Sequence, residues 1–274
     1  MLMMLVISSL LIFANKKLKI KEDPRLDVIE SLLPNANCGA CGYAGCRQFA
    51  EALIAKQTQP GLCSVSDDAG RQRIGHIIGV EVVNIEKTVA RIACAGGDNV
   101  AKWAGHYQGV KNCNIAATVA GGGKACAWGC LGFGDCEQIC DFNAIDMNQH
   151  GLPVVNEELC TACGDCVTIC PKELFSLHKI SHRLWVNCKN LQKGDEILAA
   201  CEVACTACGR CAMDAREDLI IMDNNLPIVD YSKTHETKEP LQRCPTGAIV
   251  WINDSGTIEK GVESKKIIRQ TALM

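Results

Sequence analysis

Eight cysteines lie between Cys126 and Pro171, and their spacing restricts the fold of this 274-residue chain more than any other part of its sequence. From Cys160 to Pro171 the spacing is Cys-x2-Cys-x2-Cys-x3-Cys-Pro. This pattern is typical of chains that hold two 4Fe-4S clusters, in which three cysteines of one loop bind one cluster and the fourth binds its neighbour. The run therefore predicts a pair of iron-sulfur clusters.

The ligands of the first cluster follow from this crossed pairing. Each cluster has four irons and each iron needs one thiolate, so a tight loop supplies three ligands and a distant cysteine supplies the fourth. Gly164 lies inside the tight loop, where a residue without a Cβ lets backbone amides turn toward the sulfurs. The expected ligands are Cys140, Cys160, Cys163 and Cys166.

The second cluster takes Cys170 and three cysteines of a less regular motif, Cys-x3-Cys-x5-Cys-x3-Cys, which starts at Cys126. Phe133 stands three residues before Cys136, where the middle ligand is expected. Cys126 is the nearest spare cysteine. The expected ligands are therefore Cys126, Cys130, Cys136 and Cys170.

Zinc and disulfide bonds are the alternative uses of these cysteines. Paired Cys-x2-Cys motifs also hold structural zinc, but zinc sites rarely add a third Cys-x2 step and a trailing Cys-Pro. Disulfides belong to oxidising compartments and small secreted domains, and no cleavable secretory signal is evident. Iron-sulfur clusters are the favoured interpretation.

Residues 1–22 predict a membrane anchor and a basic stop segment. Residues 1–14 are almost entirely apolar, and four lysines follow between residues 16 and 21. This run is short for a full membrane span, which needs about 20 apolar residues. The lysines would place the rest of the chain on the cytoplasmic side of the inner membrane.

Residues 23–70 predict a small helical module with a cluster of its own. Asp23 and Pro24 are typical of a helix start, and a second amphipathic helix follows the third cysteine of the module. Pro60 and Gly61 turn the chain back so that Cys63 completes the site, a pattern that zinc also fits. The expected ligands are Cys38, Cys41, Cys46 and Cys63.

Residues 71–112 are expected to be linking strands, because apolar residues alternate at Val80 and Val82 and again at Val89 and Ile92. The glycines at 121–123 with Lys124 lack the spacing and the Ser or Thr of a phosphate-binding loop, so they predict a flexible turn. The basic tail around Lys265 and Arg269 is expected to be a solvated face.

An internal repeat relates the two halves of the remaining chain. A shift of about 75 residues maps the cysteines around Cys130 onto those around Cys205, and Cys170-Pro171 onto Cys244-Pro245. In the second copy all four ligands of one cluster are absent; their positions hold Ala215, Thr234, Thr237 and Pro240. The other cluster is retained, with expected ligands Cys205, Cys208, Cys211 and Cys244.

Four cysteines remain after these sixteen are assigned. A possible fifth cluster would use Cys94, Cys113, Cys188 and Cys201. These cysteines lack a tight triplet, and the alternative is that some are buried free thiols. The sequence therefore predicts four 4Fe-4S clusters and allows five.

The overall composition agrees with small modules folded around inorganic cores, because the chain has 20 cysteines and only 4% aromatic residues. A formal net charge of −3 gives no electrostatic support for nucleic-acid binding. We expect an α+β fold: the anchor, the small helical module, a ferredoxin-like βαβ pseudo-repeat module at 113–180 with two clusters, and a degenerate one at 181–274 with one cluster.

These motifs in this order resemble the B subunit of the Rnf complex, the ion-translocating ferredoxin:NAD oxidoreductase of bacterial membranes. The resemblance spans nearly the whole chain and is most specific in NCGACGYAGC (37–46), CLGFGDC (130–136) and CTACGDCVTICP (160–171). The chain departs from the family in its shorter anchor and in Asp141, which replaces the proline that usually follows Cys140.

The resemblance implies an electron carrier without catalytic residues of its own. It would take electrons from soluble reduced ferredoxin and pass them through its clusters to membrane and flavin-bearing partner subunits, while other subunits bind NADH and translocate sodium ions or protons. Two alternatives stay open at this point: a zinc-stabilised interaction scaffold, and an anchored polyferredoxin that serves another membrane reductase.

Overall fold

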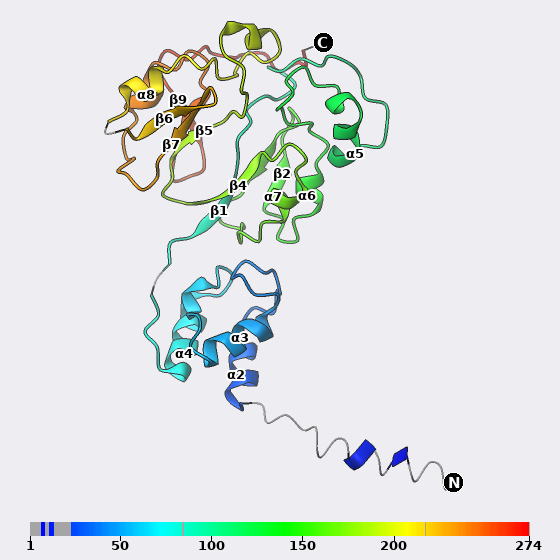
Figure 1. Cartoon of the computed structure of the whole chain (residues 1–274), viewed down its shortest axis with the longest axis vertical. Coiled ribbons are helices and arrows are strands. Elements are labelled where there is room, and N and C mark those ends of the chain that lie inside the picture. Colours follow the sequence, from blue (N-terminus) through cyan, green and yellow to red (C-terminus); the bar gives the residue numbers. More distant parts are fainter. Residues whose placement is uncertain (1–6, 9–10, 14–22, 84, 217, 274) are drawn as a thin grey trace. The chain divides into compact units, whose positions relative to one another are not determined.

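The computed structural model describes residues 7–8, 11–13, 23–83, 85–216 and 218–273. The chain forms two compact units, Met1–Ile85 and Glu86–Met274, and each is described by itself (Figure 1). Most of the expected anchor, including the four lysines, lies outside the described residues; positions 7–8 and 11–13 are helical. Among the described residues there is no helix with the length and apolar character needed to cross a membrane.

The first unit is a set of short helices around one apolar core. The predicted helices are confirmed as α2 (Arg25–Leu32) and α3 (Cys46–Ile54), and the turn before Cys63 is the 3-10 helix η1 (Pro60–Leu62). Asp23 accepts a hydrogen bond from the Arg25 amide at the start of α2. Phe49 and Leu53 of α3 pack with Ile29 of α2 in the core.

A helix that was not predicted from the sequence completes this unit. Residues predicted as the start of linking strands form α4 (Asp68–Ile78), and no strand is present among the described residues between Ile78 and Thr88. Asp67 caps α4 by accepting from the Gly70 amide, and Gly79 ends it in the left-handed conformation at φ 69°. These two flanking residues were the helix signals.

The first half of the second unit follows the order β-α-β-β-α-β. Its elements are β1 (Thr88–Ile92), α6 (Asp135–Gln138), β2 (Ile145–Met147), β3 (Pro153–Val155), α7 (Asp165–Ile169) and β4 (Phe175–Lys179). β1 pairs antiparallel with β4, and β2 pairs with β3 as a hairpin. The expected boundary at residue 113 therefore differs from the structure, because β1 already belongs to this half.

The second half repeats this order. Its elements are β5 (Leu184–Val186), α8 (Arg210–Asp214), β6 (Ile220–Asp223), β7 (Leu226–Val229), α9 (Glu239–Gln242), β8 (Ile249–Ile252) and β9 (Ile258–Lys260). β5 pairs with β8 as β1 pairs with β4, and β6 and β7 form the hairpin. Figure 1 shows the two groups of elements within this unit. The mixed helix and strand content agrees with the expected α+β class.

Four short elements of the described residues lie outside the repeated order: β9, which pairs with β8, and three helical segments. The 3-10 helix η3 (Asp195–Ala199) precedes Cys201 in the second half, while α5 (Cys113–Thr118) and η2 (Ala120–Gly122) form an insertion in the first. The halves are joined near these segments, because Lys102 and Glu202 donate backbone hydrogen bonds to Ala200 and Val100.

Candidate metal centres

All twenty cysteines lie in the described part of the chain and all are free. Within that part, no group of three or more His, Cys, Asp or Glu side chains is arranged to hold a single metal ion. The cysteines instead gather in fours, and four of these groups each line a cavity.

The group in the first unit has the predicted membership. Its cavity is lined by all four expected cysteines, Cys38, Cys41, Cys46 and Cys63. Cys46 is the first residue of α3, and its amide donates to the Asn37 side chain at 2.8 Å. Gly39 and Gly42 turn the loop with φ of 72° and 84°, a conformation that favours glycine. Local chain geometry thus brings three of the four thiols together.

The expected group of Cys140, Cys160, Cys163 and Cys166 is also brought together around α7. The pKa of Cys166 is raised to about 12, mainly by burial and also by the neighbouring Cys160 and Cys163 and then Cys136 and Cys140. Backbone amides donate to two of the sulfurs, from Ala90 to Cys160 at 3.4 Å and from Ala144 to Cys140 at 3.3 Å. Such amide contacts are typical of iron-sulfur ligands.

The third group differs from the prediction in one member. Its cavity is lined by Cys113, Cys130, Cys136 and Cys170, and not by Cys126. Cys113 begins α5, so the insertion supplies the thiol that is missing at Phe133. A buried carboxylate holds Cys113 in this group, because both Asp135 oxygens accept hydrogen bonds from the Cys113 amide at 2.9 Å. Asp135 was not identified from the sequence.

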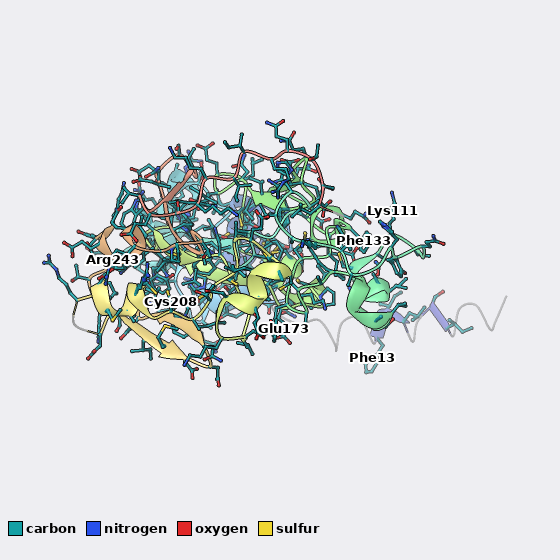
Figure 2. The ribbon with its side chains drawn as sticks, turned by 90° about the horizontal axis from the view of Figure 1, so that it is seen from above. Phe13, Lys111, Phe133, Glu173, Cys208 and Arg243 are labelled. Carbon is teal, nitrogen blue, oxygen red and sulfur yellow. The ribbon has the colours of Figure 1, made fainter. Side chains whose placement is uncertain are left out.

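The fourth group, Cys205, Cys208, Cys211 and Cys244, lines a cavity around α8, as expected. Cys208 is the one cysteine classed as exposed, and it lies near Arg243 at the edge of the unit (Figure 2). Phe133 and Lys111 are on the opposite side of the unit in this view. Where the second copy lacks a cluster's ligands, Ala215 and the buried Pro240 stand instead.

The last cavity is lined by Cys94, Cys126, Cys188 and Cys201. The possible fifth group was expected to contain Cys113, so Cys113 and Cys126 exchange places relative to the prediction. The predicted repeat already relates two of these cysteines, because Cys126-x3-Cys130 in the first half matches Cys201-x3-Cys205 in the second, but that match does not assign them to one group.

The donor sets fit metal clusters chemically. Burial is the main cause that raises thiol pKa values, to about 12 at Cys188 and Cys201 and to about 11 at Cys205 and Cys211. Buried thiolates without a compensating cation are costly. A bound iron cluster supplies that cation and releases the protons.

Two family models match the chain at these groups. The model described as "Putative Fe-S cluster" matches residues 33–65, which contain the cysteines of the first unit. The model described as "4Fe-4S binding domain" matches residues 152–175, which contain the regular run from Cys160 to Cys170. Both matches agree with the iron-sulfur interpretation of these cysteines.

Curated relatives extend the similarity to most of the chain. The B subunit of the Na(+)-translocating ferredoxin:NAD(+) oxidoreductase complex of Acetobacterium woodii is 35% identical over 258 residues, which cover 94% of this chain and 76% of the relative. The B subunit of the ion-translocating oxidoreductase complex of Methanosarcina acetivorans is 36% identical, covering 88% of this chain and 91% of the relative.

A third relative is the B subunit of the proton-translocating ferredoxin:NAD(+) oxidoreductase complex of Clostridium ljungdahlii, which is 37% identical over 89% of this chain and 87% of its own length. The expected resemblance is thereby confirmed. The chain belongs to the family of B subunits of the ion-translocating oxidoreductase, or Rnf, complexes.

Proposed function

We propose that this chain is the electron-carrying subunit of a membrane-bound ferredoxin:NAD+ oxidoreductase that translocates sodium ions or protons. Soluble reduced ferredoxin is the donor, and membrane and flavin-bearing subunits of the same complex are the acceptors. The names of the relatives from Acetobacterium woodii and Clostridium ljungdahlii, both ferredoxin:NAD(+) oxidoreductase subunits, support this role. The observation that carries it is the gathering of cysteines in fours around cavities.

Four 4Fe-4S clusters, one in the first unit and three in the second, supply one-electron redox chemistry when bound. The first unit would hold one on Cys38, Cys41, Cys46 and Cys63. The first half of the second unit, a ferredoxin-like module, would hold two, one on Cys140, Cys160, Cys163 and Cys166 and the other on Cys113, Cys130, Cys136 and Cys170. The degenerate second half would hold one on Cys205, Cys208, Cys211 and Cys244.

The chain's own groups would tune and protect these centres. Amides of Ala90 and Ala144 donate to cysteine sulfurs, and such donors stabilise the more negative, reduced form. Burial of Cys136 and Cys166 in an apolar core keeps water away from the ligands. The exposed Cys208 brings one group to the surface, where electron transfer to or from a partner protein is feasible.

Residues 1–22 would anchor the chain at the cytoplasmic face of the inner membrane. The apolar run followed by four lysines supports this placement. Membrane attachment would keep the second unit, with its ferredoxin-like modules, beside the subunits that accept its electrons.

Replacement of Cys166 by Ala in the intact complex tests the function. We expect the loss of about four irons per chain and a fall of about tenfold or more in ferredoxin-driven NADH formation. Thr168→Ala is the matched control, because Thr168 lies on the same helix and its hydroxyl bonds only a backbone carbonyl among the contacts described. Unchanged iron and electron flow in C166A would contradict the proposal.

Elemental analysis of the unmodified protein, purified without oxygen, separates this function from a zinc scaffold. The proposal requires iron and acid-labile sulfide in equal amounts and a broad visible absorbance. Little iron with stoichiometric zinc would mean that the chain is an interaction module. Copurification of the complex identifies the partners, and a different membrane reductase in that sample would replace the assigned acceptor.

A further inference from the structure

We infer that Cys94, Cys126, Cys188 and Cys201 hold a further 4Fe-4S cluster, which bridges the two halves of the second unit. The inference deepens the proposed function, on which it rests. Sequence spacing alone does not indicate this site, because its four cysteines come from four separate segments and include no tight triplet. The feature that points to it is the cavity that all four line.

The two halves contribute equivalent residues to this cavity. In the first half, Cys94 follows β1 after one intervening residue, as Cys188 follows β5 in the second. Cys126 stands four residues before the first cysteine of its triplet, and Cys201 stands four residues before Cys205. Each half therefore supplies two thiols from matching places, so the site is a product of the repeat.

Backbone hydrogen bonds follow the same pattern in the two halves of the cavity. The Cys94 sulfur accepts from the amides of Gly96 and Cys130, both at 3.4 Å. The Cys188 sulfur accepts from the amides of Asn190 at 3.4 Å and Cys205 at 3.3 Å. Amide donors to sulfur are the contacts that iron-sulfur ligands receive in proteins generally.

These hydrogen bonds also join the cavity to its neighbours. Cys130 belongs to the third group described above, whose Cys136 lies in α6 and which is called the group of α6, and Cys205 belongs to the group around α8. Each donates its amide to a sulfur of the bridging group. The bridging cavity thus lies between the two groups that the repeat makes equivalent.

Gly96 shows that the space among these sulfurs is kept open. A Cβ at this position would lie 3.2 Å from the Cys201 sulfur and 3.6 Å from the Cys94 sulfur. A side chain here would project among thiols from both halves. The absence of one leaves room beside two of the four thiols, as a metal cluster requires.

The surroundings of the cavity suit a charged centre that is shielded from water. Lys124 has only 1% of its side chain exposed, and its ammonium group donates to the carbonyl oxygens of Gly96 and Cys130 at 2.6 and 2.8 Å. Ile267 of the C-terminal tail packs against the same core, and Arg269 pairs with Glu202 beside Cys201. The basic residues of the tail, Lys265, Lys266 and Arg269, are exposed, in agreement with the expected solvated face.

Iron counting on single and double variants tests the ligand set. Replacing two cysteines of one cluster, singly or together, should remove one cluster. Replacing two cysteines of different clusters should remove two. The unmodified protein should hold about twenty irons, and C126A, C201A and the double variant C126A/C201A should each hold about sixteen. The double variant C126A/C136A should hold about twelve.

Other results overturn the inference in distinct ways. If Cys126 shares a cluster with Cys136, C126A/C136A keeps about sixteen irons and C126A/C201A falls to about twelve. If the bridging cysteines are free thiols, the unmodified protein already holds about sixteen irons, a count that needs no variant. Little iron in the unmodified protein would instead reject the proposed function as a whole.

Discussion

At the scale of single residues, Lys124 is the least expected feature of this chain. The sequence predicts a flexible turn here, and the three preceding glycines do have positive φ values. The lysine itself is buried, with its ammonium group bound to two carbonyl oxygens. It lowers the pKa values of Cys126 and Cys130, against the larger raising effect of burial. Lys124 is thus a fixed positive charge between two cysteine groups.

Replacement of Lys124 by Met should make the potentials of the two adjacent centres more negative. The lost positive charge no longer stabilises the reduced state, and a charge interaction of about 0.5–1.5 kcal/mol corresponds to about 20–60 mV for one electron. Redox titration followed by electron paramagnetic resonance measures the shift. Lys193→Met, at an exposed position, is the control and should leave the potentials in place. Equal shifts in both variants would mean that burial gives Lys124 no special role.

The same substitution should also lower the free energy of unfolding, because the Gly96 and Cys130 carbonyl oxygens lose their donor. The expected cost is about 1–3 kcal/mol. Thermal unfolding of the iron-loaded variant, compared with the unmodified protein, measures this loss.

At the scale of elements, the insertion that carries α5 supplies the thiol that the irregular motif of the first half lacks. The second half has the regular Cys205-x2-Cys208-x2-Cys211, whereas Phe133 occupies the middle position of the first. Phe133 packs against Tyr107 with ring centroids 5.6 Å apart. The Tyr107 ring precedes α5, so this contact and the Asp135 carboxylate together hold the insertion where Cys113 reaches its group.

Replacement of Asp135 by Ala should therefore remove one cluster without touching a cysteine. The Cys113 amide loses a buried, charged acceptor, at a cost of about 2 kcal/mol, and α5 loses its fixed position. We expect about four fewer irons per chain. Asp135→Asn keeps one oxygen acceptor and should retain most of this iron. An iron content in D135A equal to that of the unmodified protein would show that Cys113 needs no such anchor.

At the scale of the whole molecule, the apolar cores are small and contain cysteines. Among the described residues of the first unit, the core cluster has nine buried residues, one of which is Cys63. The second unit has further cores that contain cysteines. One contains Cys136, Cys160 and Cys166, another contains Cys126 and Cys201, and a third contains Cys211. Metal binding and folding are coupled in such modules, because the ligands are themselves part of the core.

Removal of iron should accordingly abolish cooperative thermal unfolding. Treatment with an oxidant and a chelator, followed by calorimetry, measures this in the full chain. Without iron, the buried thiols bring no metal bonds to offset the entropy of ordering short elements. Reconstitution with iron and sulfide should restore the transition. An iron-free chain that melts as sharply as the loaded one would show that its apolar cores suffice.

The sequence by itself determined the local parts of this protein. The groups around α3, α7 and α8 each take three cysteines from one short segment, so backbone geometry alone brings those thiols together. The helices at Arg25 and Cys46, the repeat, and the family were likewise readable from caps, spacing and motifs.

Only the tertiary structure decided between Cys113 and Cys126. Both cysteines are separated from most members of their groups by long stretches of chain, and the length of such a stretch sets no direction in space. The buried Asp135 holds Cys113 in the group of α6. The bridges Ala101–Cys201 and Trp103–Lys124 hold Cys201 and the segment before Cys126 on one stretch of chain, beside a second cavity. Spacing assigns the cysteines of a tight Cys-x2-Cys-x2-Cys triplet to one group; outside such a triplet, packing and buried hydrogen bonds make the choice.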